Sequence, residues 1–406
     1  MPYLWERNEK VMRRRQLTNY SHTIYASYLG CISQAIVNNF APLLFLTFQS
    51  SMALSIQSIT LITTVNFLVQ LLVDLICARY VDKIGYRTCL VSAHICAALG
   101  LVGLAVLPKV IQPYTGIMVS VVLYAIGGGI IEVLVSPVVE ACPTEKKEAA
   151  MSLLHSFYCW GHVAVVLLST AFFHFVGIEN WAVLACIWAA IPVFNGVYYS
   201  LVPLYPIVSE EKKMSLGGLL KQKIFWLLIV MMVCSGASEQ AVGQWVSAFA
   251  ESALNVSKTM GDLLGVCSFA ALMGTARAIY GKYSDGIPLK SMMIFSSLMC
   301  IGCYCLAAFT ANPIAGLLGC GFCGFSVGIF WPGTFSTAMR VLPGGGTAMY
   351  AFMALAGDLG CSSGPTVVGM VADAAGGDLR KGIAVALVFP IVMLISTCLI
   401  GYRKEN

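Results

Sequence analysis

Long apolar stretches alternate with short polar connections along almost the whole chain. The apolar stretches cover residues 20–48, 57–79, 88–107, 114–138, 150–176, 181–203, 223–249, 262–281, 289–310, 314–338, 347–372 and 382–401. Each is close to the ~20 residues that an α-helix needs to cross the hydrocarbon core of a bilayer. The pattern therefore predicts an all-α polytopic membrane protein with twelve transmembrane helices.

The longest polar connection divides this pattern into two equal parts. It covers residues 209–223, between the sixth and seventh apolar stretches, and it holds six charged side chains. We therefore predict two pseudosymmetric six-helix halves, an N-terminal half at 19–203 and a C-terminal half at 223–402. The remaining segments are an N-terminal tail (1–18), a central loop (204–222) and a C-terminal tail (403–406), all expected on the same side of the membrane.

Composition supports a membrane protein, and charge predicts its orientation. The chain is 58% hydrophobic and 11% charged, whereas soluble domains contain about 25% charged residues. With the N-terminus inside, 19 Lys and Arg residues fall in inner segments and 4 in outer loops. This excess predicts cytoplasmic termini in a multi-pass protein of the cell (inner) membrane. The same inner segments explain the net charge of +5, so no nucleic-acid partner is expected.

The cysteines do not suggest a metal site. Most of the 16 lie singly inside apolar stretches, where cysteine behaves as a small hydrophobic residue. Cys320 and Cys323 have CxxC spacing, but no second cysteine pair or histidine lies near them in the sequence. No metal ligand is therefore predicted.

A single carboxylate lies near the middle of the apolar segment Tyr124–Glu140. Glu132 follows three consecutive glycines and precedes Ser136-Pro137. A carboxylate in the bilayer core costs roughly 2.5–3.5 kcal/mol and is tolerated where it faces a protein interior or a water-filled cavity. In such a site it can load and release a proton near neutral pH. We predict that Glu132 and Glu239 are proton-coupling residues; the alternative for Glu132 is a purely structural pair with a buried cation.

The two halves repeat one another. Asp82 follows the second apolar stretch and Asp285 follows the eighth, 203 residues later. Eight residues before each lies a charge inside a span, Asp74 and Arg277, at the same spacing. A looser match relates Pro143, Ala150-Met151 and Gly161 to Pro343, Ala348-Met349 and Gly360, at spacings of 198 to 200. Two six-helix halves related in this way form the parallel internal repeat of the major facilitator fold.

The loop Ala78–Arg87 resembles the cytoplasmic loop signature of the major facilitator superfamily, G-x-x-x-D-[RK]-x-G-[RK]-[RK]. It has Ala78 in place of the first glycine and Tyr86 in place of one basic residue. The resemblance implies the major facilitator fold and a loop that caps a helix end and gates the cytoplasmic side. The predicted cytoplasmic gate residues are Asp74, Asp82, Lys83, Arg87, Glu140, Arg277 and Asp285.

Four short segments are similar to the fucose permease and hexose–proton symporter group of that superfamily. Ile131-Glu132 with Ser136-Pro137 resembles its fourth-span pattern. The segment His155–Gly161 resembles its fifth-span pattern, in which side chains at the positions of His155 and Tyr158 face sugar. Ser235–Trp245 and Ala276–Gly281 resemble seventh- and eighth-span patterns. Asn38, four residues before Pro42, stands where the group has an aspartate, so the first span lacks that carboxylate.

Polar and aromatic side chains inside the spans suit a small polar solute. Amides offer hydrogen-bond donors and acceptors together, which suits hydroxyl groups, and Trp and Tyr rings suit the apolar face of a sugar. The predicted substrate-binding residues are Gln34, Asn38, Asn39, His155, Tyr158, Trp160, Gln240, Gln244, Trp245, Trp331 and Asp358. For any single Asn or Gln the alternative is a helix–helix hydrogen bond, which contributes about 0.6 kcal/mol in membranes.

These features favour a secondary active transporter that works by alternating access. The chain has no GxSxG, P-loop or HExxH motif, so no enzymatic activity is expected. Transport energy should come from an ion or substrate gradient, without a cofactor. Our first hypothesis is proton-coupled import of a sugar or sugar-like solute by a monomer, with sodium coupling and facilitated diffusion left open. A proton-coupled efflux antiporter for amphipathic drugs or metabolites is the second, and a membrane receptor or scaffold is the third.

Overall fold

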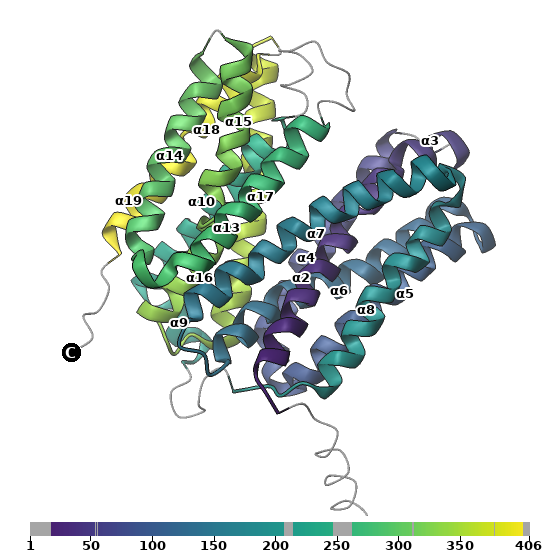
Figure 1. Ribbon diagram of the computed structural model, residues 1–406, viewed down its shortest axis with the longest axis horizontal. Coiled ribbons are helices and arrows are strands. Elements are labelled where there is room, and N and C mark those ends of the chain that lie inside the picture. The colour runs from purple at the N-terminus through teal and green to yellow at the C-terminus, as the bar shows by residue number, and fades with distance from the viewer. Residues whose placement is uncertain are drawn as a thin grey trace, which may run out of the picture.

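The computed structural model describes residues 18–52, 54, 56–206, 214–246, 262–310, 312–376 and 378–400. Every regular element in these residues is a helix. The helices form two groups, one coloured purple to teal and the other green to yellow (Figure 1). The prediction of an all-α chain is confirmed.

The first group contains the helices of the N-terminal half. They are α2 (Ser21–Asn39), η1 (Ala41–Leu44), α3 (Phe45–Met52), α4 (Ile56–Ile84), α5 (Tyr86–Val110), α6 (Pro113–Ala141), α7 (Lys147–Val176), η2 (Ile178–Asn180) and α8 (Trp181–Leu201). Helix α6 packs against α2, α4 and α5, and α2 also packs against α7. The close approach of α5 to α6 requires Gly127, because a Cβ there would lie 2.5 Å from the carbonyl oxygen of Ala93.

The second group contains the helices of the C-terminal half, preceded by the short α9 (Leu216–Leu220). They are α10 (Lys223–Gly243), the π-helix η4 (Asp262–Cys267), α13 (Ser268–Tyr283), η5 (Ser284–Gly286), α14 (Leu289–Phe309), α15 (Pro313–Val327), α16 (Phe330–Val341), α17 (Gly346–Ala374), α18 (Leu379–Ala386) and α19 (Val388–Leu399). Helix α10 packs against α17. Gly360 permits this contact, because a Cβ there would lie 2.1 Å from the carbonyl oxygen of Val233.

Nine helical segments of the described residues are long and apolar enough to cross a membrane. They coincide with nine of the twelve predicted spans, and the other three fall on α2 with α3, on η4 with α13, and on α17. The count of twelve and the cytoplasmic location of the termini stay predictions. The domain boundaries also stay predictions, and residues 1–17, 207–213 and 401–406 lie outside the described residues.

A proline divides the predicted span 314–338 into α15 and α16. Pro332 has no N–H, so the carbonyl of Gly328, four residues earlier, lacks its usual helical partner. Backbone polar groups inside a membrane need a partner within the protein. Arg277 of α13 donates from Nε to this carbonyl at 2.7 Å. The break in the helix thus creates a place where a buried guanidinium is bound.

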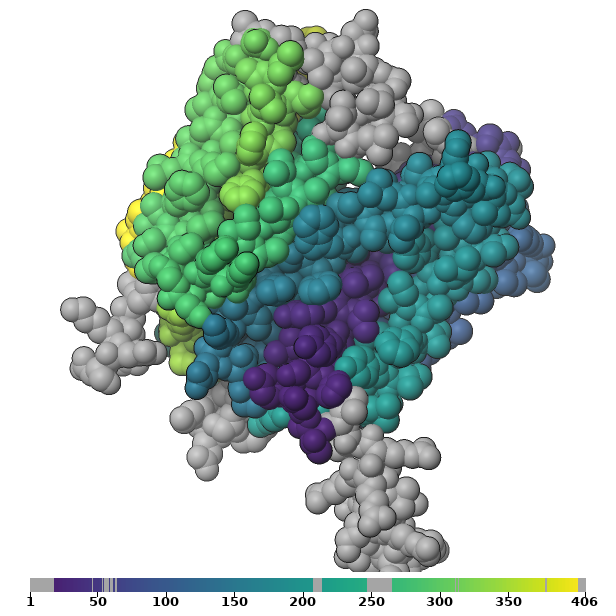
Figure 2. Space-filling model, in the orientation of Figure 1, coloured from purple at the N-terminus to yellow at the C-terminus, as the bar shows by residue number. Residues whose placement is uncertain are grey.

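The two groups of helices meet mainly along two helix pairs, α7 with α13 and α4 with α17, beside smaller contacts of α6 with α17 and of α7 with α16. The pairs occupy equivalent places in the internal repeat, because α13 corresponds to α4 and α17 to α7. Figure 2 shows the blue-teal surface of α7 lying against the green surface of the second group. Side chains that connect these helix pairs therefore connect the two halves of the molecule.

Candidate functional site

Glu132 is placed inside the molecule by α6. Its side chain is half-buried, and its Oε2 atom accepts a hydrogen bond of 2.7 Å from Nε2 of Gln34 in α2. Gln34 is 7% exposed. The carboxylate thus has a fixed amide donor on one side while it keeps some access to solvent. This arrangement can hold a proton or a polar ligand.

Amide side chains extend the polar region from Glu132 along α2 and α4. Oδ1 of Asn38 accepts hydrogen bonds from Nε2 of Gln70 at 2.9 Å and from Nδ2 of Asn66 at 3.4 Å. The side chain of Tyr158 in α7 lies beside those of Asn38 and Asn39. Asn39 also donates to the carbonyl of its own helix at Ala35, at 2.9 Å. Asn38 and Tyr158, both predicted to bind substrate, are therefore brought together.

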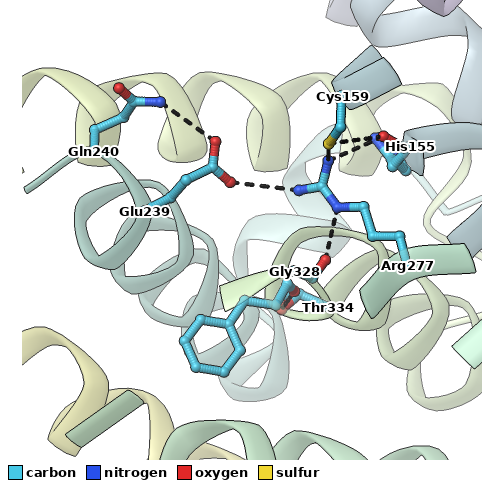
Figure 3. Close-up of polar contacts among 8 residues, drawn as sticks. His155, Cys159, Glu239, Gln240, Arg277, Gly328 and Thr334 are labelled. Carbon is cyan, nitrogen blue, oxygen red and sulfur yellow. Dashed lines mark hydrogen bonds and ion pairs between the residues drawn. The ribbon is translucent and has the colours of Figure 1, made fainter. Parts of the chain in front are cut away.

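Arg277 links the two halves at the centre of a second cluster (Figure 3). Besides the carbonyl of Gly328, its guanidinium donates to the carbonyl of His155 at 3.0 Å and to Sγ of Cys159 at 2.9 Å, both in α7. It also forms an ion pair of 3.4 Å with Oε2 of Glu239 in α10. The side chain of Arg277 is 4% exposed and that of Glu239 is 13% exposed. Arg277, which the sequence grouped with the cytoplasmic gate, thus pairs with Glu239, which the sequence grouped with proton coupling.

His155 connects α6 to an aromatic group. Its Nε2 atom lies 3.1 Å from Oγ of Ser136 in α6, and its ring stacks on Phe335 with the centroids 6.0 Å apart. Phe335 in turn contacts Trp331 edge to face at 6.2 Å and stacks on Tyr350 at 5.2 Å. His155 and Trp331 therefore belong to one continuous region that spans both halves.

Glu132 lies near two further carboxylates, which come from the other half. Its charge interacts with those of Asp358 in α17 and Glu239 in α10. Asp358 is half-buried, and its Oδ2 atom has no hydrogen-bond partner among the described residues. A proton or a cationic group placed among the three carboxylates would interact with both halves at once.

The remaining predicted substrate-binding residues contact other elements. Gln240 donates from Nε2 to Oε1 of its neighbour Glu239 at 3.3 Å. Gln244 is the exposed C-cap of α10. Trp245 donates from Nε1 to the carbonyl of Pro365 at 3.1 Å. Trp160 is 42% exposed and lies against Gly274 of α13. Their roles in substrate binding stay predictions.

At the end of the molecule predicted to be cytoplasmic, polar contacts join the halves at equivalent places of the repeat. Thr347, at the start of α17, donates to Oδ1 of Asp82 at 2.7 Å and also contacts the hydroxyl of Tyr86. Lys146, just before α7, forms an ion pair with Asp285. These contacts hold the halves together beside the two copies of the repeated loop. In this conformation that end of the interface is therefore closed.

Further charges at this end surround a cavity of about 700 Å³. Glu140 lies 3.8 Å from Nζ of Lys147, and Glu148 pairs with Arg340. Glu148 also accepts a hydrogen bond of 2.9 Å from the hydroxyl of Tyr280. The predicted gate residue Glu140 is thus bound within this ionic group.

Arg87 and Lys83 lie in the same region but have different contacts. Arg87 donates to the carbonyls of Tyr199, Ser200 and Val202 at distances of 2.8 to 2.9 Å. These carbonyls belong to the last turn of α8 and to its C-cap, where helical partners are missing and a cation is favoured. Lys83 is exposed and lies 6.0 Å from the ring centroid of Tyr80. Their gating roles stay predictions.

A family model described as the Major Facilitator Superfamily matches residues 26–365. The chain belongs to the Major Facilitator Superfamily. It is therefore a multi-pass membrane transporter and not an enzyme, in agreement with the resemblance seen in the sequence. The chain is also similar in sequence to the membrane protein MosC of Rhizobium meliloti, with 21% identity over 262 residues. The match covers 63% of this chain and 62% of the length of that relative.

Solved Major Facilitator Superfamily structures share the fold over nearly the whole chain. The E. coli fucose:proton symporter FucP is 15% identical and matches with a TM-score of 0.78, covering 94% of this chain and 98% of FucP. The proton:xylose symporter XylE, bound to 6-bromo-6-deoxy-D-glucose, is 12% identical with a TM-score of 0.78, covering 93% and 94% of the two chains. At these identities the likeness shows the fold alone.

Three residues at the centre of the site were not among the predicted site residues of the sequence. Gln70 was visible as a polar residue within the second apolar stretch, but nothing in the sequence pairs it with Asn38. Gly328 was signalled by Pro332, because a proline leaves the carbonyl four residues before it without a partner. Cys159 carries no such signal, because a lone cysteine in an apolar stretch resembles any small hydrophobic residue.

Proposed function

We propose that this Major Facilitator Superfamily transporter imports a sugar or sugar-like small polar solute, coupled to protons, across the cell (inner) membrane. The observation that carries the proposal is the position of Glu132. This half-buried carboxylate accepts a hydrogen bond from Gln34 and lies near the charge of Asp358 in the other half. A group placed in this way can bind a proton and communicate its presence to both halves.

The solute site that we propose lies between Glu132 and the amides of α2 and α4. Asn38 already accepts two hydrogen bonds, and Tyr158 lies beside it. Hydroxyl groups of a solute can exchange with these amide contacts without leaving a donor or an acceptor unpaired, which is the main condition for binding a polar solute in a buried site. His155 and Trp331, which both contact Phe335, would contribute an imidazole and an aromatic ring.

The coupling that we propose uses charge rather than a bound cofactor. A proton on Glu132 would reduce its repulsion with Asp358, and Arg277 would hold Glu239 between α10 and α7 throughout. The contacts at Asp82 and Asp285 close the end of the molecule that we predict to be cytoplasmic. We therefore expect the solute and the proton to enter from the opposite side. FucP and XylE, which share the fold, are proton symporters of sugars, and this supports the assignment.

A second candidate function is proton-coupled efflux of amphipathic cations. The gathering of Glu132, Glu239 and Asp358 favours it, because three carboxylates near one another suit a positively charged ligand. The amides around Asn38 favour the sugar, because an efflux site for lipophilic compounds has little use for paired amide donors and acceptors. The two functions differ in ligand and in direction, so one set of measurements separates them.

The test is uptake into proteoliposomes that contain the purified protein. We expect one or more members of a labelled monosaccharide panel to accumulate when the outside is more acidic than the inside, and an ionophore that dissipates the gradient to abolish the accumulation. Glu132→Gln should lose accumulation but keep exchange between equal pools. The matched control is Glu179→Gln, an exposed carboxylate in η2, which should behave as wild type. Stabilisation of the protein by lipophilic cations and by no sugar would refute the proposal in favour of efflux.

A further inference from the structure

Asp74 is a buried charge that the proposed function does not use. It lies in α4 and is 1% exposed, and neither carboxylate oxygen has a hydrogen-bond partner among the described residues. Burying an ionised carboxylate without a partner is very costly, so such a group binds a proton or acquires another partner. Which of the two applies to Asp74 depends on the groups that surround it.

Asp74 lies in α4, which packs against α17. Val73 and Cys77 of α4 share a core cluster with Ala351 and Ala354 of α17. Asp358 follows Ala354 by four residues, which is one helical turn further along the same face. The Oδ2 atom of Asp358 is likewise buried without a partner. Two incompletely paired carboxyl groups therefore belong to one interface between the halves.

Helical geometry places the two carboxyl groups at similar heights. Helices α4 and α17 are antiparallel: α4 ends beside the contact between Asp82 and Thr347, α17 begins there, and both extend from it to the same side. Asp74 lies eight residues from Asp82, a rise of about 12 Å, and Asp358 lies eleven residues from Thr347, a rise of about 16 Å. The difference is less than one helical turn, so the two residues lie at similar depths in the interface between α4 and α17.

The internal repeat gives the same placement independently. Asp74 corresponds to Arg277, since 277 − 74 = 203, the spacing of the two repeated loops. Asp358 corresponds to Cys159, since 358 − 159 = 199, the spacing of Gly161 and Gly360. Arg277 contacts Cys159 at 2.9 Å. The equivalent positions in the other helix pair are those of Asp74 and Asp358, which we call the acidic pair.

The surroundings of the acidic pair are negative or neutral. The charges that act on Asp74 in the described part of the chain are those of Asp358 and, from α6, Glu132. The thiol of Cys77 lies near Asp74, and that of Cys361 lies near Asp358, Glu132 and, from α10, Glu239. With no cation among these neighbours, a proton is the positive charge available to the pair.

We propose that the acidic pair is a second proton-binding site, at which one proton shared by Asp74 and Asp358 joins the two halves. With one proton bound, the protonated carboxyl group donates its O–H to the ionised one, and such charge-assisted bonds are short and strong. When the proton leaves to water, two carboxylates face each other and repel. Helices α4 and α17 then separate, and the contact of Asp82 with Thr347 breaks. This inference goes beyond the proposed function, because it concerns what opens the closed end and requires no solute.

The experiment is amide hydrogen exchange of the full-length protein without solute, across a range of pH and corrected for intrinsic exchange. Peptides that cover Asp82 and Thr347 report opening of the closed end. One proton released per opening makes the opening equilibrium rise about tenfold per pH unit, in the range above the ionisation of the separated carboxyl groups and below the pH at which the closed pair loses its shared proton. In Asp74→Asn and in Asp358→Asn the amide can donate to the remaining carboxylate at every pH, so the slope should vanish. Asp373→Asn, an exposed carboxylate near the other end of α17, should keep the wild-type slope.

Two results would overturn the inference outright, and a third would replace the proton by a metal cation. One is a wild-type protein whose exchange at these peptides does not depend on pH, a measurement that needs no variant to fold. The other is a pH slope that Asp74→Asn and Asp358→Asn retain in full. If sodium chloride restores protection at high pH where choline chloride does not, the site binds a metal cation rather than a proton. The exchange experiment contains no solute, so a failure of sugar uptake would not affect its outcome. A failure of the exchange experiment would likewise leave the proposed sugar transport untouched.

Discussion

Replacing Arg277 by methionine should destabilise the protein more than replacing its partner Glu239 by glutamine. The guanidinium of Arg277 has four partners in three elements, and methionine retains none of them. Glutamine at position 239 keeps an oxygen that can still accept from Arg277. The two substitutions therefore remove different parts of one ion pair.

The magnitudes follow from the contacts. Methionine at position 277 leaves the carbonyl of Gly328 buried without a partner, which costs about 1–3 kcal/mol. It also leaves Glu239 without its cation, and breaking a buried pair costs about 3–5 kcal/mol. The two effects overlap, so we expect a loss of about 3–5 kcal/mol in the free energy of unfolding. Glu239→Gln replaces an ion pair by a hydrogen bond from the charged guanidinium to a neutral amide oxygen, a loss of about 1–1.5 kcal/mol.

A double-mutant cycle tests the pairing directly. Once Arg277 is methionine, Glu239→Gln removes an uncompensated charge and should be neutral or stabilising. The coupling energy should therefore reach at least about 1 kcal/mol, within the range seen for contacting residues. Equilibrium unfolding in mixed detergent micelles measures all four proteins, with Lys282→Met, an exposed cation of the same helix, as the control. Equal effects of Glu239→Gln in both backgrounds would show that Arg277 serves only as a hydrogen-bond donor to backbone carbonyls.

Three further outcomes are expected. Glu132→Gln should abolish accumulation of solute against a gradient while exchange between equal pools persists, and normal accumulation would remove Glu132 from the coupling mechanism. Lys146→Ala should weaken the closed end by removing the ion pair with Asp285, seen as faster labelling of an engineered cysteine near that loop; unchanged labelling would contradict a gating role. Gly360→Ala should lower the melting temperature, because the added Cβ would collide with the backbone of α10. The control is Gly302→Ala, where no atom lies within 4 Å of the added Cβ, and it should be neutral or stabilising.

The apolar pattern predicted the helices well because a membrane helix needs a long apolar stretch and little else. It did not predict where helices break. The stretch 314–338 reads as one span, yet it contains α15 and α16. Pro332 marks the break in the sequence, but a kinked helix and two helices have the same apolar pattern. The side chain of Arg277, which binds the freed carbonyl, comes from a different helix and decides the outcome.

The candidate site was only partly predictable for a related reason. Position along a span gives the depth of a side chain in the membrane but not the helix that it faces. Glu132 and Gln34 were both recognised as candidates, yet they are 98 residues apart and nothing local pairs them. Arg277 was grouped with the gate from its place in the repeat, whereas its long side chain reaches Glu239. Pairings of this kind depend on how the helices pack against one another. The pattern of apolar and polar residues constrains that packing only weakly.

The repeat predicts two equivalent contacts between the halves, and their different chemistry suggests an order of opening. At one contact Arg277 carries a permanent charge and is bound by α7, α10 and the carbonyl of Gly328. At the other, Asp74 has no hydrogen-bond partner among the described residues, and an acidic pair there depends on a proton that water can remove. A contact held by an exchangeable proton responds to pH, whereas one held by arginine does not, because the guanidinium stays charged. Opening should therefore begin between α4 and α17, with the α7–α13 contact acting as the hinge about which the halves turn.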